Sequence, residues 1–150
     1  MALSTAMQRT KKALVARLGA RPELAGKVTY GVPRVTPTTE WIHVGRIEGD
    51  ERAVTLGKSS LGRREENFSI VVTISVIRSW VDDPEDVADR AFALLAEIED
   101  ELRDAPTLGL DPTTDGLFWA GVTRKDVDEE GDGSQRQAVI IARVGCMARI

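Results

Sequence analysis

The chain of 150 residues, 42% of them apolar, has the size of one ordinary domain, and we expect residues 1–150 to form a single domain with its own core. Its only cysteine, Cys146, excludes an internal disulfide, and no apolar run approaches the length of about 18 residues that a membrane-spanning helix requires. The net charge of −4 is unevenly divided: residues 1–34 carry seven lysines and arginines against one glutamate, so +6 in that segment leaves −10 for the remainder.

The first clear pattern is a basic helix near the N-terminus. One helical face is formed by Met7, Lys11, Leu14 and Leu18. Gly19 and Pro22 supply a stop, because glycine suits a left-handed cap and proline cannot continue a helix, so the sequence predicts a helix over residues 4–18. The segment lacks the continuous apolar core of a signal peptide, which favours a protein made and used in a reducing cytoplasm. Residues 20–38 hold three prolines and two glycines and are expected to be an irregular connection.

Two predicted strands follow, separated by a long charged connection. Glu40–Glu48 is rich in Trp, Ile and Val, which favour strands. Gly49–Asn67 is expected to be a loop of 19 residues, a length typical of functional or disordered segments. From Phe68 to Ile77 the even positions are all apolar, which predicts a strand packed on the core through those positions. The odd face is half apolar, which is more than bare solvent exposure requires.

The clearest predicted helix begins at Asp83-Pro84, because aspartate suits the N-cap and proline suits the first turn. Its apolar stripe, with spacings of three and four residues, consists of Val87, Ala91, Leu94, Ile98 and Leu102. The helix is expected to end at residues 104–106. Acids such as Glu97 and Glu101 lie off the stripe, so we expect them to be solvated and to lack the perturbed pKa of a catalytic carboxylate.

The last two predicted strands, Leu117–Val127 and Gln135–Ile150, are joined by the acidic, glycine-containing turn Asp128–Ser134, which predicts a hairpin. The order of elements is therefore α-β-β-α-β-β. This order predicts an α+β domain in which two helices pack on one face of a single, mainly antiparallel sheet.

Patterns that usually carry catalysis or cofactor binding are incomplete. His43, the only histidine, has no cysteine or histidine partner nearby, which disfavours nucleophilic catalysis and a zinc site. Residues 57–59 (GKS) imitate the end of a phosphate-binding loop, but Arg52 stands where the first glycine belongs. Asp126–Gly131 matches the start of a calcium loop, but Gln137 occupies the position of the bidentate carboxylate. We predict no catalytic, cofactor or metal site, and the scattered aromatic residues disfavour nucleic-acid binding.

The run Arg52–Ile77, followed by the predicted helix Asp83–Arg103 and two strands, resembles the tail-terminator and tail-completion (head–tail joining) proteins of long-tailed bacteriophages. The most characteristic part is Leu56-Gly57 leading through residues 64–66 (REE) into the alternating strand. As an order of elements, the resemblance covers most of the chain. It implies an α+β fold and a non-enzymatic structural protein without cofactors.

The resemblance implies a tail terminator that forms a ring, hexameric in this family, which caps the tail tube and joins it to the head connector. The implied partners are further copies of the chain, the tail tube protein and a head–tail connector or neck protein, with no membrane. DNA would pass through the lumen of the ring without specific binding. The implied location is the tail or neck of the virion, after assembly in the cytoplasm of the bacterial host.

The resemblance also implies that the connection Gly49–Asn67 projects toward the ring or tube interface. Its expected contact residues are Arg52, Lys58, Arg63, Arg64, Glu65 and Glu66. A ring subunit needs two complementary patches, because head-to-tail contacts are heterologous. The basic first 34 residues, including Arg9, Lys11 and Lys12, and the acidic remainder are candidates for that pair, although such charges also suit ordinary solvated helix faces.

The apolar residues of the odd face are a further candidate contact. They are Val71 and Ile77, together with Val139 and Ile141 of the last predicted strand. Either a neighbouring subunit or a helix of the same chain would cover them.

Other functions stay open from the sequence alone. Another neck or head–tail connector protein would differ from a terminator in its position in the virion. A small dimeric ligand-binding α+β module would need a concave apolar pocket with convergent polar groups. An enzyme would be indicated by an activity that His43→Ala abolishes.

Overall fold

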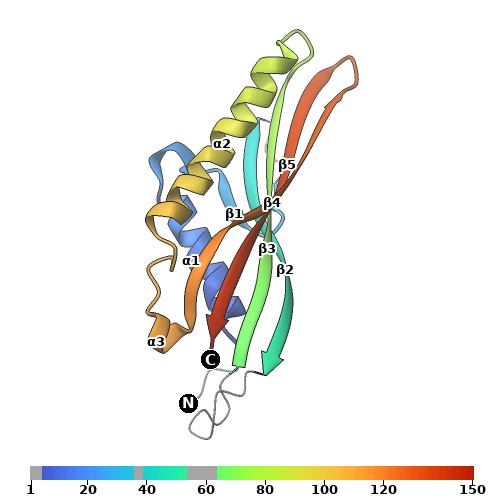
Figure 1. Ribbon diagram of the computed structural model, residues 1–150. Coiled ribbons are helices and arrows are strands. Elements are labelled where there is room, and N and C mark those ends of the chain that lie inside the picture. The colour runs from blue at the N-terminus through green and yellow to red at the C-terminus, as the bar shows by residue number, and fades with distance from the viewer. Residues whose placement is uncertain (1–4, 36–38, 54–63) are drawn as a thin grey trace, which may run out of the picture.

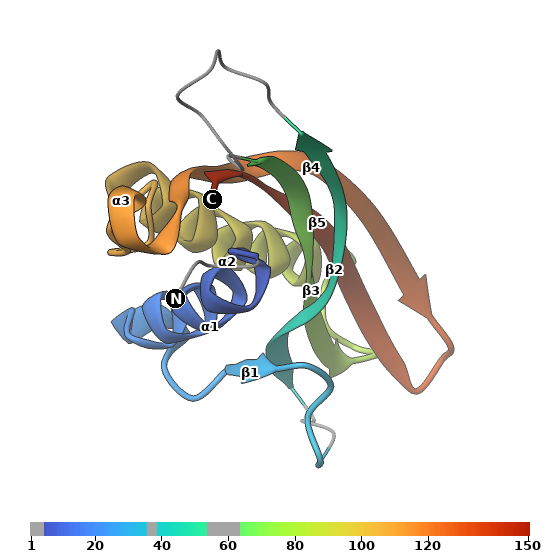
Figure 2. The same ribbon diagram turned by 90° about the horizontal axis from the view of Figure 1, so that it is seen from below.

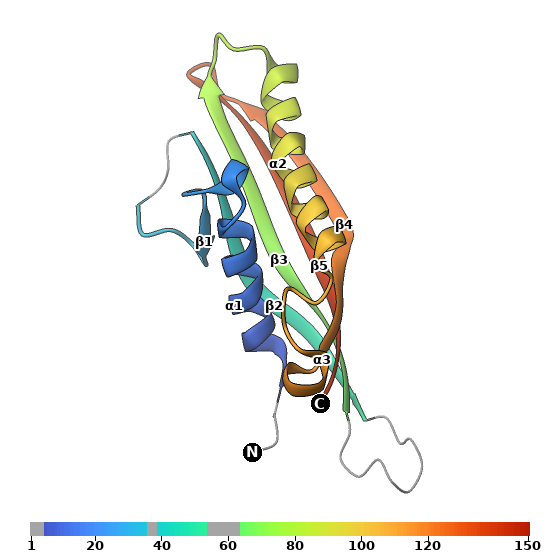
Figure 3. The ribbon, with the colours of Figure 1, turned by 90° about the vertical axis from the view of Figure 1, so that its left-hand side faces the viewer.

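The computed structural model describes residues 5–35, 39–53 and 64–150, and within strands it leaves the side chains of residues 50–53 and 64 undescribed (Figure 1). One five-stranded sheet has the strand order β1-β2-β3-β5-β4. The predicted α+β architecture is confirmed, with the two main helices packed on one face of the sheet (Figures 2 and 3). The elements are α1 (Met7–Gly19), the 3-10 turn η1 (Pro22–Leu24), β1 (Val28–Tyr30), β2 (Glu40–Ala53), β3 (Arg64–Ser79), α2 (Pro84–Asp104), α3 (Pro112–Asp115), β4 (Leu117–Gly131) and β5 (Gln135–Arg149).

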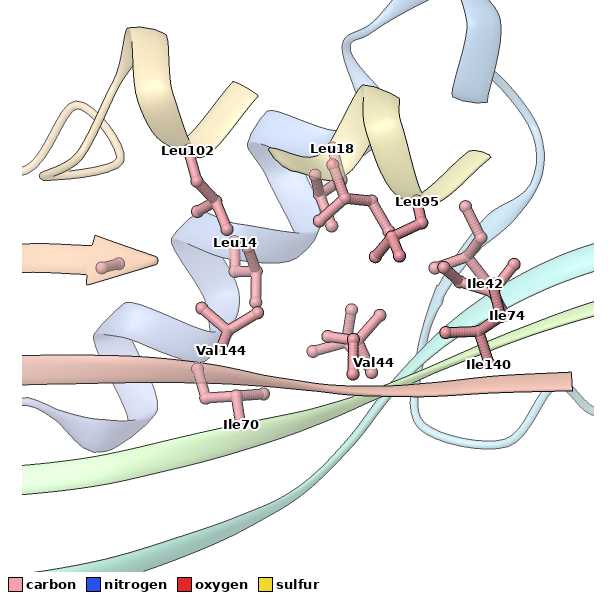
Figure 4. Close-up of a cluster of buried hydrophobic side chains, with 14 of the residues drawn as sticks. Leu14, Leu18, Ile42, Val44, Ile70, Ile74, Leu95, Leu102, Ile140 and Val144 are labelled. Atoms are coloured by element: carbon pink, nitrogen blue, oxygen red, sulfur yellow. The ribbon is translucent and has the colours of Figure 1, made fainter. Parts of the chain in front are cut away.

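The core lies between the sheet and the helices, as the even-numbered side chains of β3 predict. Phe68, Ile70, Val72, Ile74 and Val76 are all buried. The core residues of the other elements that Figure 4 labels are Leu14, Leu18, Ile42, Val44, Leu95, Leu102, Ile140 and Val144. A fully buried leucine or isoleucine contributes about 1.5–3 kcal/mol relative to exposure, so this layer holds the helices on the sheet.

The β2–β3 hairpin is longer than the sequence predicts. The pairing of Asp50 with Asn67 and of Ala53 with Arg64 extends both strands into the expected loop Gly49–Asn67, over residues 49–53 and 64–67. The prediction of a 19-residue loop was therefore wrong, because charged residues such as these also occur in a paired ribbon. The remaining residues, 54–63, lie outside the described part of the chain.

A buried acid from β3 caps the first helix. Glu66 is 1% exposed, and its Oε1 accepts a hydrogen bond of 2.7 Å from the backbone N–H of Ala6. Its Oε2 accepts another of 2.7 Å from the hydroxyl of Thr5. The first turn of α1 contains no acid of its own. Glu66 therefore supplies the negative charge that the positive end of a helix favours.

The second helix begins as the sequence predicts. The side chain of Asp83 accepts a hydrogen bond of 2.9 Å from the backbone N–H of Glu85, and Pro84 occupies the first turn. The expectation that the acids of α2 are solvated is wrong for Glu101, which is only 8% exposed. Arg17 of α1 and Arg21, which lies between α1 and η1, donate hydrogen bonds of 2.8 Å each to its carboxylate. The two helices are thus joined by ion pairs, and the amphipathic stripe of α2 gives no sign of them.

Three short features differ from the sequence prediction. Within residues 20–38, expected to be irregular, η1 forms and β1 pairs in parallel with β2. The turn of the last hairpin is shorter than the predicted Asp128–Ser134, since β4 continues to Gly131 and β5 begins at Gln135. The turn α3 was not predicted, although Asp111 caps it through Thr113.

Candidate interaction surface

One face of the sheet carries none of the described helices. Figure 2 shows α1 and α2 together on one side of the curved sheet, while the opposite side is uncovered by any described segment. We call this the open face. Because side chains alternate along a strand, it carries the odd-numbered residues of β3 and β5, including Val71, Ile77, Val139 and Ile141. None of the described helices covers these residues, because α1 and α2 both lie on the opposite face of the sheet.

The open face combines half-buried apolar side chains with ion pairs. Ile141 is 37% exposed, whereas Val71 is only 8% exposed. Arg143 of β5 lies beside Val71 in the register and reaches Glu48 on β2 at 3.3 Å, so its side chain crosses β3. A second contact of 3.4 Å joins Arg143 to Asp126 of β4. Hydrogen bonds from Arg46 and then from Arg143 lower the pKa of Glu48, so the carboxylate stays charged at neutral pH.

At one end of the open face lies a shallow groove of about 530 Å³. Its floor is low because Gly145 pairs with Ser69 on one side and with Gly121 on the other. The ring of Trp119 lies over Gly121, where an added Cβ would meet its Cζ2 at 2.6 Å. Thr123 lies over Gly145 in the same way, at 2.5 Å from such a Cβ. Glycines at these two positions thus allow side chains to lie flat on the sheet.

The groups that catalysis would use are poorly placed. His43 lies on the open face of β2, and its Nδ1 is buried without a hydrogen-bond partner among the described atoms. Burial lowers the pKa of His43, which favours the neutral ring at pH 7. Cys146 is 2% exposed, and burial raises the pKa of its thiol to about 12. A thiol in that state is not a nucleophile at neutral pH.

Two further findings concern binding groups within the described residues. No three side chains of His, Cys, Asp or Glu gather there in a way that could hold a metal ion. None of the helices in this part of the chain is both long enough and apolar enough to cross a membrane.

The predicted contact residues of the β2–β3 ribbon fall into three groups. Lys58 and Arg63 lie outside the described residues. Arg52 pairs with Glu65 in the strand register, and Arg64 pairs with Ala53, so these residues belong to strands rather than to a loop. Glu65 accepts a hydrogen bond of 3.3 Å from the side chain of Asn67.

Glu66 does not fit its predicted role as a contact residue. It is buried and bonded to the start of α1, because the even positions of β3 point toward the helices along the whole strand. Val71 is also buried, although on the open face, and Ile77 is half-buried there.

The basic N-terminal segment is largely paired within the chain. Arg9 bonds Asp115 at 2.7 Å, and Lys27 lies 3.7 Å from Glu40. Lys11 is 9% exposed, and its ammonium lies 4.0 Å from the centre of the Tyr30 ring.

These contacts join segments far apart in sequence, so the charge count alone could not reveal them. Of the three predicted contact residues on α1, Lys12 is exposed without an ion pair among the described residues.

Neither a protein-family model nor a curated protein matches this sequence. Among solved structures, a chain from the virion of a native gene transfer agent (GTA) particle has a similar structure, with a TM-score of 0.64 and 18% sequence identity. The alignment covers 97% of this chain and 100% of that chain. At this level of identity the similarity shows a shared fold, and a shared fold does not by itself assign a function.

Proposed function

We propose that this protein is a structural virion protein, a tail terminator whose ring, hexameric as in the family it resembles, caps a tail tube and joins it to the head connector. The observation that carries the proposal is the similarity over nearly the whole length of both chains to a chain from a GTA virion. An insertion or a missing element would have reduced that coverage. The order of elements, which resembles that of tail-terminator proteins, supports the same assignment.

The chemistry of the described residues agrees with a non-enzymatic role. The single histidine is neutral and half-buried in a strand, and the single cysteine is buried with a raised pKa. The carboxylate whose pKa is lowered most, that of Glu40, is held by arginines in an ion-pair cluster and does not lie near a nucleophile. Such clusters also occur for structural reasons, so a perturbed pKa here does not indicate a catalytic site.

The open face provides surface for contacts within a virion. Trp119, Ile141 and Met147 are each 37–39% exposed on this face. A large exposed apolar surface is typical of an interaction site rather than of an isolated monomer. We assign the partners accordingly as further copies of this chain, a tail tube protein and a connector or neck protein. DNA would pass through the ring without specific contacts, and assembly would take place in the host cytoplasm before the protein becomes part of the virion.

The assembly state of the purified protein tests the ring. The monomer has a mass of 16.4 kDa, so a hexamer would have about 98 kDa by mass photometry. Negative-stain electron microscopy should then show closed rings. A protein that stays monomeric, both alone and with purified tail tubes, would contradict the ring.

The position in the particle tests the terminator role. An antibody against the protein should label the head-proximal end of the tail in particles released by the producing bacteria. Labelling elsewhere in the neck would favour another head–tail joining protein. A ligand-binding module would instead show a small-molecule-dependent rise in melting temperature; the groove on the open face, which is shallow, offers little enclosure for such a ligand.

A further inference from the structure

Exposed apolar side chains gather at the two opposite edges of the sheet. At the β4 edge, Phe92 of α2 is 47% exposed and Val127 of β4 is 45% exposed. At the β1 edge, Tyr30, Val32 and Val35 are 48%, 80% and 81% exposed. Single exposed apolar residues are common, but two groups at opposite edges are the arrangement that a head-to-tail contact needs.

Phe92 and Val127 belong to one patch. Glu99 of α2 forms an ion pair of 2.9 Å with Lys125 of β4, which fixes the side of the helix that faces this strand. Phe92 lies two helical turns before Glu99 and therefore on the same side of α2. Val127 lies two residues after Lys125 and so on the same face of β4. The step from Glu99 back to Phe92 and the step from Lys125 on to Val127 both lead toward the β4–β5 turn, because α2 begins beside that turn (Figure 3).

The two edges carry opposite charge. Residues 126–132 contain five acids and no cation, and Asp128, Glu129 and Glu130 are exposed without an ion pair among the described residues. Residues 24–39 contain two cations and no acid. One of these cations, Arg34, is exposed and forms no ion pair within the described part of the chain.

The two patches also lie at the same level of the molecule. A single row of paired residues crosses the sheet from Val28 in β1 through Ile42, Ile74 and Ile140 to Val127 in β4. Tyr30 lies two residues after Val28, in the row that contains Lys125, and Val32, Arg34 and Val35 follow the end of β1, while the acids of the β4 edge surround Val127. Subunits related by rotation about an axis parallel to the strands can therefore bring one edge against the other with a shift of only a few residues along the axis.

We propose that the β4-edge patch of one copy docks on the β1-edge patch of the next copy, a contact that rests on the proposed ring. The β4-edge patch consists of Phe92, Val127, Asp128, Glu129 and Glu130, and the β1-edge patch consists of Tyr30, Val32, Arg34 and Val35. The apolar side chains form the centre of the contact, and the acids meet the arginine at its margin. Apolar centres with charged margins are the usual organisation of protein interfaces, and the complementary charges select the partner edge.

Charge reversal with complementation tests the contact. Glu129→Lys places a cation opposite the β1 edge of the next copy and reduces the net negative charge of the β4 edge, and Arg34→Glu places an acid opposite the acids of that edge. Each variant alone should need a protein concentration at least about tenfold higher than the wild type to assemble. An equal mixture of the two should assemble at a lower concentration than either variant alone, because in an alternating ring with an even number of subunits the two substituted positions meet with opposite charges at every second contact and the other contacts are unchanged.

Matched controls separate the contact from net charge. Asp104→Lys and Arg103→Glu make the same changes of charge at the far end of α2, at exposed positions, and should assemble like the wild type. For the apolar centre, Val127→Thr should weaken assembly, while the larger loss of apolar surface in Ile141→Thr on the open face should not. Circular dichroism and thermal melting of every variant establish that the fold is retained.

Two results would overturn the proposed contact: wild-type assembly by either charge variant alone, or a mixture that assembles no better than its components. Strong weakening by Ile141→Thr, with no effect of Val127→Thr, would assign the contact to the open face instead. The proposed function fails on a different result, the absence of the protein from released particles. A wild type that forms only dimers would remove the ring but leave the edge contact testable by the same mixture.

Discussion

Glu40 lies at the centre of an ion-pair cluster that should make the stability of the protein depend on pH. Arg90 donates hydrogen bonds of 2.7 and 3.1 Å to the carboxylate, and Arg78 donates one of 2.8 Å. These bonds, first that from Arg90, lower the pKa of Glu40 from 4.5 to about 2. The side chain of Glu40 is only 10% exposed, so solvent screens the interaction weakly.

The magnitude follows from the difference between the folded and unfolded pKa of Glu40. A fall from 4.5 to about 2 corresponds to about 3 kcal/mol at pH 7, because each pKa unit is worth about 1.4 kcal/mol. The folded-state pKa is the lower one, so this stabilisation is present above about pH 5 and is lost as the pH falls toward 2. By pH 3, about 2 kcal/mol of it should already be lost.

The test is the substitution Glu40→Gln, which keeps the shape of the side chain but removes its charge. Urea unfolding should show the variant to be less stable than the wild type by about 3 kcal/mol at pH 7 and by about 1 kcal/mol at pH 3. Glu99→Gln, which breaks the more exposed pair with Lys125, is the matched control and should cost less than about 1 kcal/mol at pH 7. An equal deficit of Glu40→Gln at both pH values would refute the reasoning.

Three further predictions concern the cap, the glycines and the thiol. Glu66→Ala should lower the free energy of unfolding by about 3 kcal/mol, and Glu66→Gln by about half as much, because the start of α1 loses charge-assisted hydrogen bonds. Chemical unfolding measures both variants, and equal losses of stability would show that the charge of Glu66 contributes nothing. Gly121→Ala should displace the exposed ring of Trp119 and red-shift the fluorescence emission of that ring, and it should change the free energy of unfolding by less than about 1 kcal/mol. Gly116→Ala should instead lower the free energy of unfolding by about 1–3 kcal/mol, because Gly116 has a φ of 88° and the new Cβ would lie 2.8 Å from a backbone oxygen. The thiol of Cys146 should not react with a disulfide reagent at pH 8 in the folded protein and should react fully in urea, and rapid reaction of the folded protein would contradict its burial.

Elements with strong local signals were predictable. The stripe of α2 and the cap at Asp83 located that helix to within one residue at its start, since both signals depend only on neighbours in sequence. The alternation of β3 gave its buried face correctly. By contrast, β1 has three residues, too few for any period to show, and it forms because β2 offers an edge to pair with.

The candidate site was less predictable than the fold. The sequence indicated that the second face of β3 is too apolar for bare solvent, and among the described segments no helix covers that face. It gave no indication that Glu66 would bond the start of α1, or that Gly121 and Gly145 would pair across two strands. These contacts join residues that are 24 or more positions apart in the sequence, and the local periodicity of a helix or strand carries no information about contacts at that separation.

The sequence by itself determined the class of the fold, the buried faces of α1, α2 and β3, and the isolation of the single histidine and cysteine. It determined these because burial leaves a period in the chain and because a missing residue type cannot be replaced by folding. Only the tertiary structure decided which charges are already paired within the chain and which edges of the sheet present opposite charges to a neighbour. Ion pairing depends on distance in space, and the strand order that brings residues 24–39 and 126–132 to opposite edges is a property of the whole sheet.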